Sequence, residues 1–218
     1  MLGLIIKDIL NLSSNKRIFV TLFIMFTFVG FMSNGLPNYL SIYLPILCLM
    51  LAISTFSYDE SSKWDRYVLA LPLSRKDIVR SRYMFSLVLL VLSFLFNILF
   101  NLLIIIVFNQ PLLLNSILIQ PLITIMIVGV IIAIVFPLIY KFGAEKGRLV
   151  MIFFSIVIGA GGALLGNLFS DQVSQTEMFD TLIPFLNTYG FYILFILSSL
   201  ALIGSYHLSL TFYNQKEI

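Results

Sequence analysis

The sequence predicts an all-α integral membrane protein with six transmembrane helices, and composition is the first reason. Of its 218 residues, 60% are hydrophobic and 11% are charged, whereas a soluble domain carries roughly 25% charged residues. The mean hydropathy is +1.06. Only lipid can solvate so much apolar surface, so a water-soluble fold is excluded.

Long uncharged runs are the second reason. A helix needs about 20 mainly apolar residues to cross the hydrocarbon core of a bilayer. Six uncharged segments approach or exceed that length, and we expect them to form one transmembrane domain over residues 1–218. The predicted spans are residues 18–35, 39–56, 84–108, 116–140, 149–169 and 189–212.

The basic residues are the third reason, because lysine and arginine are enriched in cytosolic loops. With six spans, all 13 of them fall in alternate segments and none falls in the three segments on the other side. We therefore expect a multi-pass protein with both termini in the cytosol. The basic segments are residues 1–17, 57–83, 141–148 and 213–218.

The N-terminal segment is too short and too polar to cross a membrane. Its apolar residues Leu2, Ile5, Ile6, Ile9 and Leu10 recur at helical spacing, with Lys7, Asp8 and Asn11 on the other side. This pattern predicts an amphipathic helix over residues 2–14 that lies in the inner membrane interface. A simple lead-in that anchors the first span remains an alternative.

Residues 57–83 are predicted to form a helical hairpin between the second and third spans. The first helix would start near Asp59 or Ser61 and end at Pro72, with an apolar face of Trp64, Tyr67, Val68 and Leu71. The second would start at Ser74, with Asp77 in the position of a capping box. Its basic residues could merely set topology and contact lipid phosphates. A docking surface for a soluble partner also explains the apolar face.

The run FSYDESSKWDRYVLALPLSRKDIVRSRY resembles the signature of small ABC-2 type transporter permeases. In that signature F-x-x-D-E is followed by a lone tryptophan and by L-P-[LV]-S-R. Leu4, Lys7 and Asp8 resemble the opening of the same family. Within the family, the chain is most similar to permeases of phenol-soluble modulin exporters and of bacteriocin or lantibiotic immunity transporters.

The resemblance implies a type V exporter-like fold in a bacterial cytoplasmic membrane, with a cytosolic coupling helix in residues 57–83. It implies a path for a hydrophobic or amphipathic substrate, such as cytolytic or antimicrobial peptides. Two copies of a separate ATPase subunit would bind ATP and Mg²⁺, and a second permease, identical or related, would pair with this chain. The implied ATPase-coupling residues are Asp59, Glu60, Trp64, Arg66, Tyr67, Leu71, Pro72 and Arg75.

The sequence itself has no G-x-x-x-x-G-K-[ST] phosphate loop. We accordingly expect no catalytic or metal site in this chain, and no nucleic acid partner. Membrane lipids are expected partners. A lone histidine and spans without acidic residues disfavour an intramembrane enzyme or an ion-coupled carrier. A channel or scaffold that needs no ATPase remains the alternative function.

Two sets of residues inside the spans each have two alternative roles. Asn97 and Asn101 lie one helical turn apart, so they could hydrogen-bond a neighbouring helix or line a polar strip of the translocation path. The glycines of the fifth span could allow close helix packing, or break it into re-entrant segments within residues 159–188. These glycines are Gly159, Gly161, Gly162 and Gly166.

Overall fold

The computed structural model describes residues 2–14, 16–32, 36–68, 74–108, 115–146, 149 and 177–215, and within these ranges all regular structure is helical. A short π-helical turn, η1 (Asn115–Ile119), precedes α6. The helices are α1 (Leu2–Ser14), α2 (Lys16–Met32), α3 (Leu36–Ser61), α4 (Trp64–Val68), α5 (Arg75–Phe108), α6 (Gln120–Phe142) and α8 (Glu177–Gln215).

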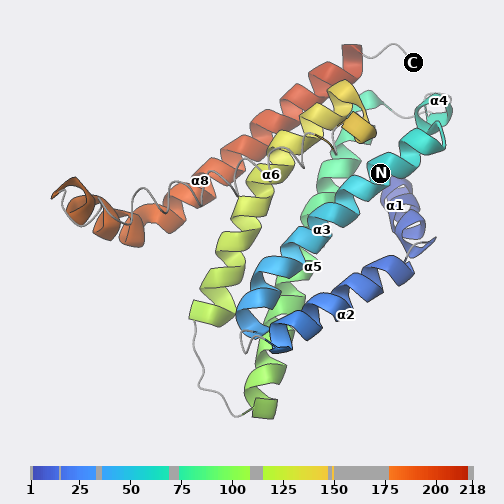
Figure 1. Ribbon diagram of the computed structural model, residues 1–218. Helices are drawn as coiled ribbons and strands as arrows, with labels where there is room; N and C mark the ends of the chain where they lie inside the picture. The colour runs from blue at the N-terminus through green and yellow to red at the C-terminus, as the bar shows by residue number, and fades with distance from the viewer. Residues whose placement is uncertain are drawn as a thin grey trace.

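The long helices pack against one another in a bundle (Figure 1). Helix α3 packs against α5 and α6, while α8 packs against α6 and α5. Helix α2 lies beside α3, and α1 packs on both α3 and α5. Helix α4 lies at the end of the bundle where α3 ends and α5 begins (Figure 1). We call this the α4 end.

Four of the described helices are long and apolar enough to cross a membrane. They match the predicted second, third, fourth and sixth spans, while α2 is apolar but shorter and corresponds to the first. The predicted fifth span, with its four glycines, lies outside the described residues apart from Leu149. Over the described residues the structure confirms a helical chain with several helices long enough to span a membrane, and the total of six spans stays a prediction. The four segments are Leu40–Ser61, Arg75–Ile104, Ile117–Phe142 and Tyr189–Gln215.

Large apolar side chains cover the outside of the bundle. Phe28 on α2, Ile106 on α5 and Leu200 on α8 are all exposed. Exposed large apolar side chains recur along each of these helices, and extensive apolar surface is rare on a soluble monomer. Within a bilayer the same side chains face hydrocarbon at no cost, which agrees with the spans assigned by length.

Aromatic rings pack the interior near the α4 end. The ring centroid of Phe136 lies 5.0 Å from that of Phe56 and 5.1 Å from that of Tyr83. Tyr140 continues the cluster, 5.4 Å from Phe56 and 5.4 Å from Tyr213. Edge-to-face pairs at these separations contribute roughly 0.5–1.5 kcal/mol each beyond their burial. They join α3, α5, α6 and α8 into one rigid end of the bundle.

Candidate functional site

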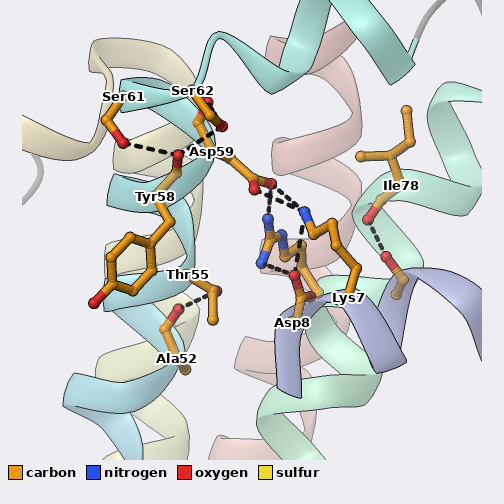
Figure 2. Close-up of polar contacts among 11 residues, drawn as sticks. Lys7, Asp8, Ala52, Thr55, Tyr58, Asp59, Ser61, Ser62 and Ile78 are labelled. Carbon is orange, nitrogen blue, oxygen red and sulfur yellow. Dashed lines mark hydrogen bonds and ion pairs between the residues drawn. The ribbon is translucent and has the colours of Figure 1, made fainter. Parts of the chain in front are cut away.

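Four charged side chains from three helices meet at the α4 end. The Nζ of Lys7 donates to both carboxylate oxygens of Asp59, at 2.7 and 2.8 Å, and lies 3.2 Å from Oδ1 of Asp8. Arg82 pairs with Asp59 through Nη2, and its Nη1 lies 2.9 Å from Oδ1 of Asp8. Figure 2 shows Lys7, Asp8 and Asp59 pointing toward one another from α1 and α3. We call these four residues the ion cluster.

The ion cluster is largely withdrawn from solvent. The side chain of Asp8 is 1% exposed and that of Arg82 is 5% exposed. Buried charges persist only when they are paired. The charges of the two acidic and two basic side chains cancel, so the ion cluster has no net charge. Removing a single member leaves an unpaired buried charge, whereas the intact set fixes how α1, α3 and α5 sit relative to one another.

Two aromatic rings extend the ion cluster. The guanidinium carbon of Arg82 lies 4.9 Å from the ring centroid of Phe56, which belongs to the aromatic interior. The Nζ of Lys7 lies 4.5 Å from the ring centroid of Trp64, the first residue of α4. Both distances suit cation–π attraction. The ion cluster therefore connects the membrane interior to α4 through direct contacts.

Helix α1 adopts the predicted amphipathic form, but its polar face does not face water. Asp8 is directed into the protein, while Ile6, Ile9 and Leu10 are exposed. An exposed apolar stripe on such a short helix suits the membrane interface. The polar face of α1 points into the protein because Arg82 forms a buried ion pair with Asp8 there.

The predicted start of the hairpin at Asp59 or Ser61 is wrong. Helix α3 continues without a break to Ser61, so Asp59 lies in its last turns instead of capping a new helix. The hydroxyls of Ser61 and Ser62 donate to the carbonyl of Tyr58, at 2.9 and 2.8 Å, which satisfies a carbonyl at the helix end. Lys63, at φ 52°, then reverses the chain into α4.

Helix α4 does not present one uniform apolar face. Val68 is fully buried and Trp64 is half-buried, but Tyr67 is 67% exposed. Val68 and Trp64 therefore hold α4 to the bundle, and Tyr67 faces outward. Arg66 belongs to α4, while Leu71 and Pro72 lie outside the described residues.

Glu60 joins the end of α3 to the segment after α6. Its Oε2 accepts the backbone N–H of Ala144 at 2.5 Å. The preceding Gly143 has φ +91°, and a Cβ built there would lie 2.8 Å from Oε1 of Glu60. A glycine is needed at this position both for its backbone conformation and for the close approach of Glu60. A cavity of about 50 Å³ adjoins Glu60, Asp59 and Arg82.

The second predicted helix start is confirmed. Ser74 and Asp77 form a reciprocal capping box at the start of α5, in which the N–H of Asp77 donates to Oγ of Ser74 at 3.2 Å and the N–H of Ser74 donates to Oδ2 of Asp77 at 3.3 Å. Arg75 donates to the carbonyls of Tyr213 and Asn214, at 3.1 and 2.7 Å. Arg75 thus caps the last turn of α8 and brings that helix to the α4 end.

Asn97 and Asn101 form hydrogen bonds inside the bundle. Nδ2 of Asn101 donates to Oδ1 of Asn97 at 2.5 Å, and the hydroxyl of Ser41 on α3 donates to the same oxygen at 3.3 Å. All three residues are buried. This geometry favours the helix–helix alternative over the polar strip.

The ion cluster was not predicted from the sequence. The helical pattern predicts that Lys7 and Asp8 lie on the polar face of an interfacial helix, and Arg82 is one of six basic residues in residues 57–83. The one available signal was that Lys7-Asp8 and Asp59-Glu60 both belong to the segments that carry the family resemblance.

The model of a family described as ABC-2 family transporter protein matches residues 3–214. No curated protein and no solved structure is significantly similar to the chain. The match covers almost the whole length, including every member of the ion cluster and all of α4. The chain therefore belongs to the ABC-2 transporter family, and it is a multi-pass membrane component of such a transporter.

Proposed function

We propose that this chain is the permease subunit of an ABC exporter and that it couples to a separate ATPase subunit through α4. The observation that carries the proposal is the contact between Lys7 and Trp64, which attaches α4 to the ion cluster. In this proposal ATP and Mg²⁺ bind to the ATPase, and two ATPase copies serve two permeases, identical or related.

The exposure pattern of α4 supports its role as a docking helix. An exposed tyrosine on a helix whose other side is held by Val68 and Trp64 is a rigid aromatic anchor, and tyrosine is enriched among residues that dominate binding energy. Force applied to Tyr67 reaches α1, α3 and α5 through Trp64, Lys7 and the charges that Lys7 contacts.

The charge distribution supports a cytosolic position for the α4 end. Six of the 13 basic residues lie in residues 57–83, and basic loops remain on the cytosolic side. Contacts bring α1 and the last turns of α8 to this same end. In the proposal both termini therefore face the cytosol of a bacterial cell, where the ATPase is available.

The cargo proposed for the exporter is a hydrophobic or amphipathic molecule, with cytolytic or antimicrobial peptides as the leading class. The resemblance to modulin exporters and immunity transporters supports this class. The apolar surfaces of α2, α5 and α8 are compatible with it, because a cargo of this kind can approach through the lipid phase.

Affinity capture tests the proposal. The tagged chain is solubilised from native membranes in mild detergent, captured, and its bound subunits are identified by mass spectrometry. Capture of a subunit that carries a phosphate-loop sequence and hydrolyses ATP supports the proposal. The test uses membranes in which any ion conductance or scaffold function of the chain is intact. If the chain is captured from them without such a subunit, the result supports the alternative channel or scaffold and contradicts the proposal.

A further inference from the structure

A small cavity lies beside the ion cluster, where α3, α5, α6 and α8 come together. Its volume is about 50 Å³, well above the roughly 10–15 Å³ that one buried water needs. Asp59 and Arg82 belong both to its lining and to the ion cluster, so the cavity borders buried charge. Glu60, Tyr140 and Tyr213 are also part of the lining. We call this cavity the polar cavity.

The guanidinium of Arg82 has hydrogen-bonding capacity that no described residue satisfies. A guanidinium carries several N–H donors, and Nη2 of Arg82 donates to Asp59. Nη1 lies 2.9 Å from Oδ1 of Asp8, but neither atom has a hydrogen-bond partner among the described residues, so the two atoms are close without being aligned. The side chain of Arg82 is only 5% exposed. Buried charged groups that lack hydrogen bonds are costly, and a buried water is the usual partner for them.

The charges around the polar cavity favour a neutral occupant. Arg82 disfavours a cation, while Asp59 and Glu60 disfavour an anion. The Nζ of Lys7 already binds both carboxylate oxygens of Asp59, so this residue offers no free carboxylate to a metal ion. An apolar side chain cannot accept a hydrogen bond from a guanidinium. Water can accept from Arg82 and donate to a carboxylate at the same time.

Glu60 provides both the second partner for water and a way in. It is the exposed residue of the lining, so the polar cavity meets solvent on its side. Its Oε2 accepts the backbone N–H of Ala144, and a carboxylate has further lone pairs for a second donor. Polar groups that face one cavity without touching are commonly bridged by an ordered water.

We propose that the polar cavity holds at least one ordered water, which accepts a hydrogen bond from Arg82 and donates one to Glu60. This water connects the ion cluster to Glu60 and, through the contact of Glu60 with Ala144, to the end of α6. It also supplies hydrogen bonding to a buried cation that the ion pairs leave incomplete. The proposal uses no property of an ATPase or a cargo, so it stands independently of the proposed function.

Radiolytic footprinting tests the proposal on the full chain in lipid nanodiscs. A short X-ray pulse forms hydroxyl radicals from water, and a radical formed at a bound water oxidises the side chains beside it, which mass spectrometry then identifies. Tyr213 lines the polar cavity and is 1% exposed, whereas Tyr83 lies outside the lining and is 7% exposed. We expect more oxidation at Tyr213 than at Tyr83, the reverse of the order that exposure to bulk solvent gives.

A radical scavenger separates bound water from bulk water. A polymeric scavenger too large to enter the polar cavity removes radicals from the bulk solvent. It should therefore abolish the oxidation of Tyr67, which is 67% exposed. The oxidation of Tyr213 should persist, because its radicals form inside the protein.

A variant that fills the polar cavity gives an independent measurement. Ala144 is buried and belongs to the lining, so the methyl groups added by Ala144→Val take the space of the water. Oxidation of Tyr213 should fall by about tenfold, the change that a loss of about 1.4 kcal/mol in water binding gives. Ala133→Val is the matched control, because Ala133 is buried on α6 outside the lining, and it should leave the oxidation of Tyr213 unchanged.

Three results would overturn the proposal. The first is oxidation at Tyr213 no greater than at Tyr83 in the unaltered chain, which needs no variant to fold and would mean that a side chain fills the polar cavity. The second is loss of the Tyr213 signal in the presence of the scavenger, which would mean that bulk solvent alone reaches this residue. The third is an unchanged Tyr213 signal in Ala144→Val.

Discussion

Asp59 and Arg82 form an ion pair between the end of α3 and the beginning of α5, although 23 positions separate them along the chain. The same arginine reaches Asp8 on α1, and the same aspartate reaches Lys7. One pair of side chains therefore closes the α3–α5 connection around α4 and fastens the N-terminal helix to it. Displacement of α4 must therefore either carry Lys7 with it or break the contact between Lys7 and Trp64.

The first prediction concerns Arg82. Arg82→Met removes the cation that faces Asp8 and Asp59 and leaves their carboxylates with Lys7 alone. Breaking a buried pair by removing one partner typically costs about 3–5 kcal/mol, so we expect a loss of this order in the free energy of unfolding, measured in detergent micelles. Arg80→Met, two residues away and exposed, serves as the control and should cost little.

A double mutant separates pairing from simple packing. If Arg82 acts through its charge, Asp8→Asn combined with Arg82→Met should be less destabilising than the sum of the two single changes. Additive losses would contradict the ion cluster, because they would mean that the two residues stabilise the fold separately.

The sequence predicted the elements of the fold better than their contacts. Hydropathy located α3, α5, α6 and α8, and Ser74 with Asp77 marked the start of α5, because both signals are local. The predicted start of a new helix at Asp59 or Ser61 is wrong because both residues are good helix caps. In the structure Asp59 instead forms ion pairs with Lys7 and Arg82. Which distant charges meet depends on helix packing, and no local pattern encodes it.

The second prediction uses the single tryptophan of the chain, Trp64. Lys7→Met removes a cation that lies over the indole ring, an interaction of roughly 0.5–1 kcal/mol at a partly exposed site. We expect the tryptophan emission to move to longer wavelength as the ring becomes more hydrated. Lys76→Met, which changes an exposed lysine, should leave the spectrum unaltered. Identical spectra for both variants would contradict the contact.

The third prediction concerns Gly143. Gly143→Ala places a Cβ at φ +91° and 2.8 Å from Oε1 of Glu60, so we expect thermal unfolding to show a loss of at least about 1–2 kcal/mol. Gly190→Ala is the control, because no atom lies within 4 Å of its added Cβ. Adding Glu60→Ala should relieve the contact but not the backbone strain. Full recovery in that double variant would show that strain at Gly143 is unimportant.

The fourth prediction decides between the two roles left open for Asn97. Ser41→Ala removes a hydrogen bond between α3 and α5; such bonds in membrane proteins average about 0.6 kcal/mol. If the contact is structural, stability should fall by roughly this amount while transport by the assembled complex is preserved. Unchanged stability with a changed transport rate or cargo preference would favour the polar strip instead.

The proposed docking of α4 on a separate ATPase can be measured through Tyr67. The measurement is the affinity of the purified chain for its ATPase in lipid nanodiscs, comparing Tyr67→Ala with Tyr192→Ala. The two tyrosines are 67% and 64% exposed, on α4 and on α8. We expect Tyr67→Ala to weaken binding by about tenfold or more, as for an aromatic anchor, and Tyr192→Ala to have no effect. Equal affinities for both variants and the unaltered chain would contradict it.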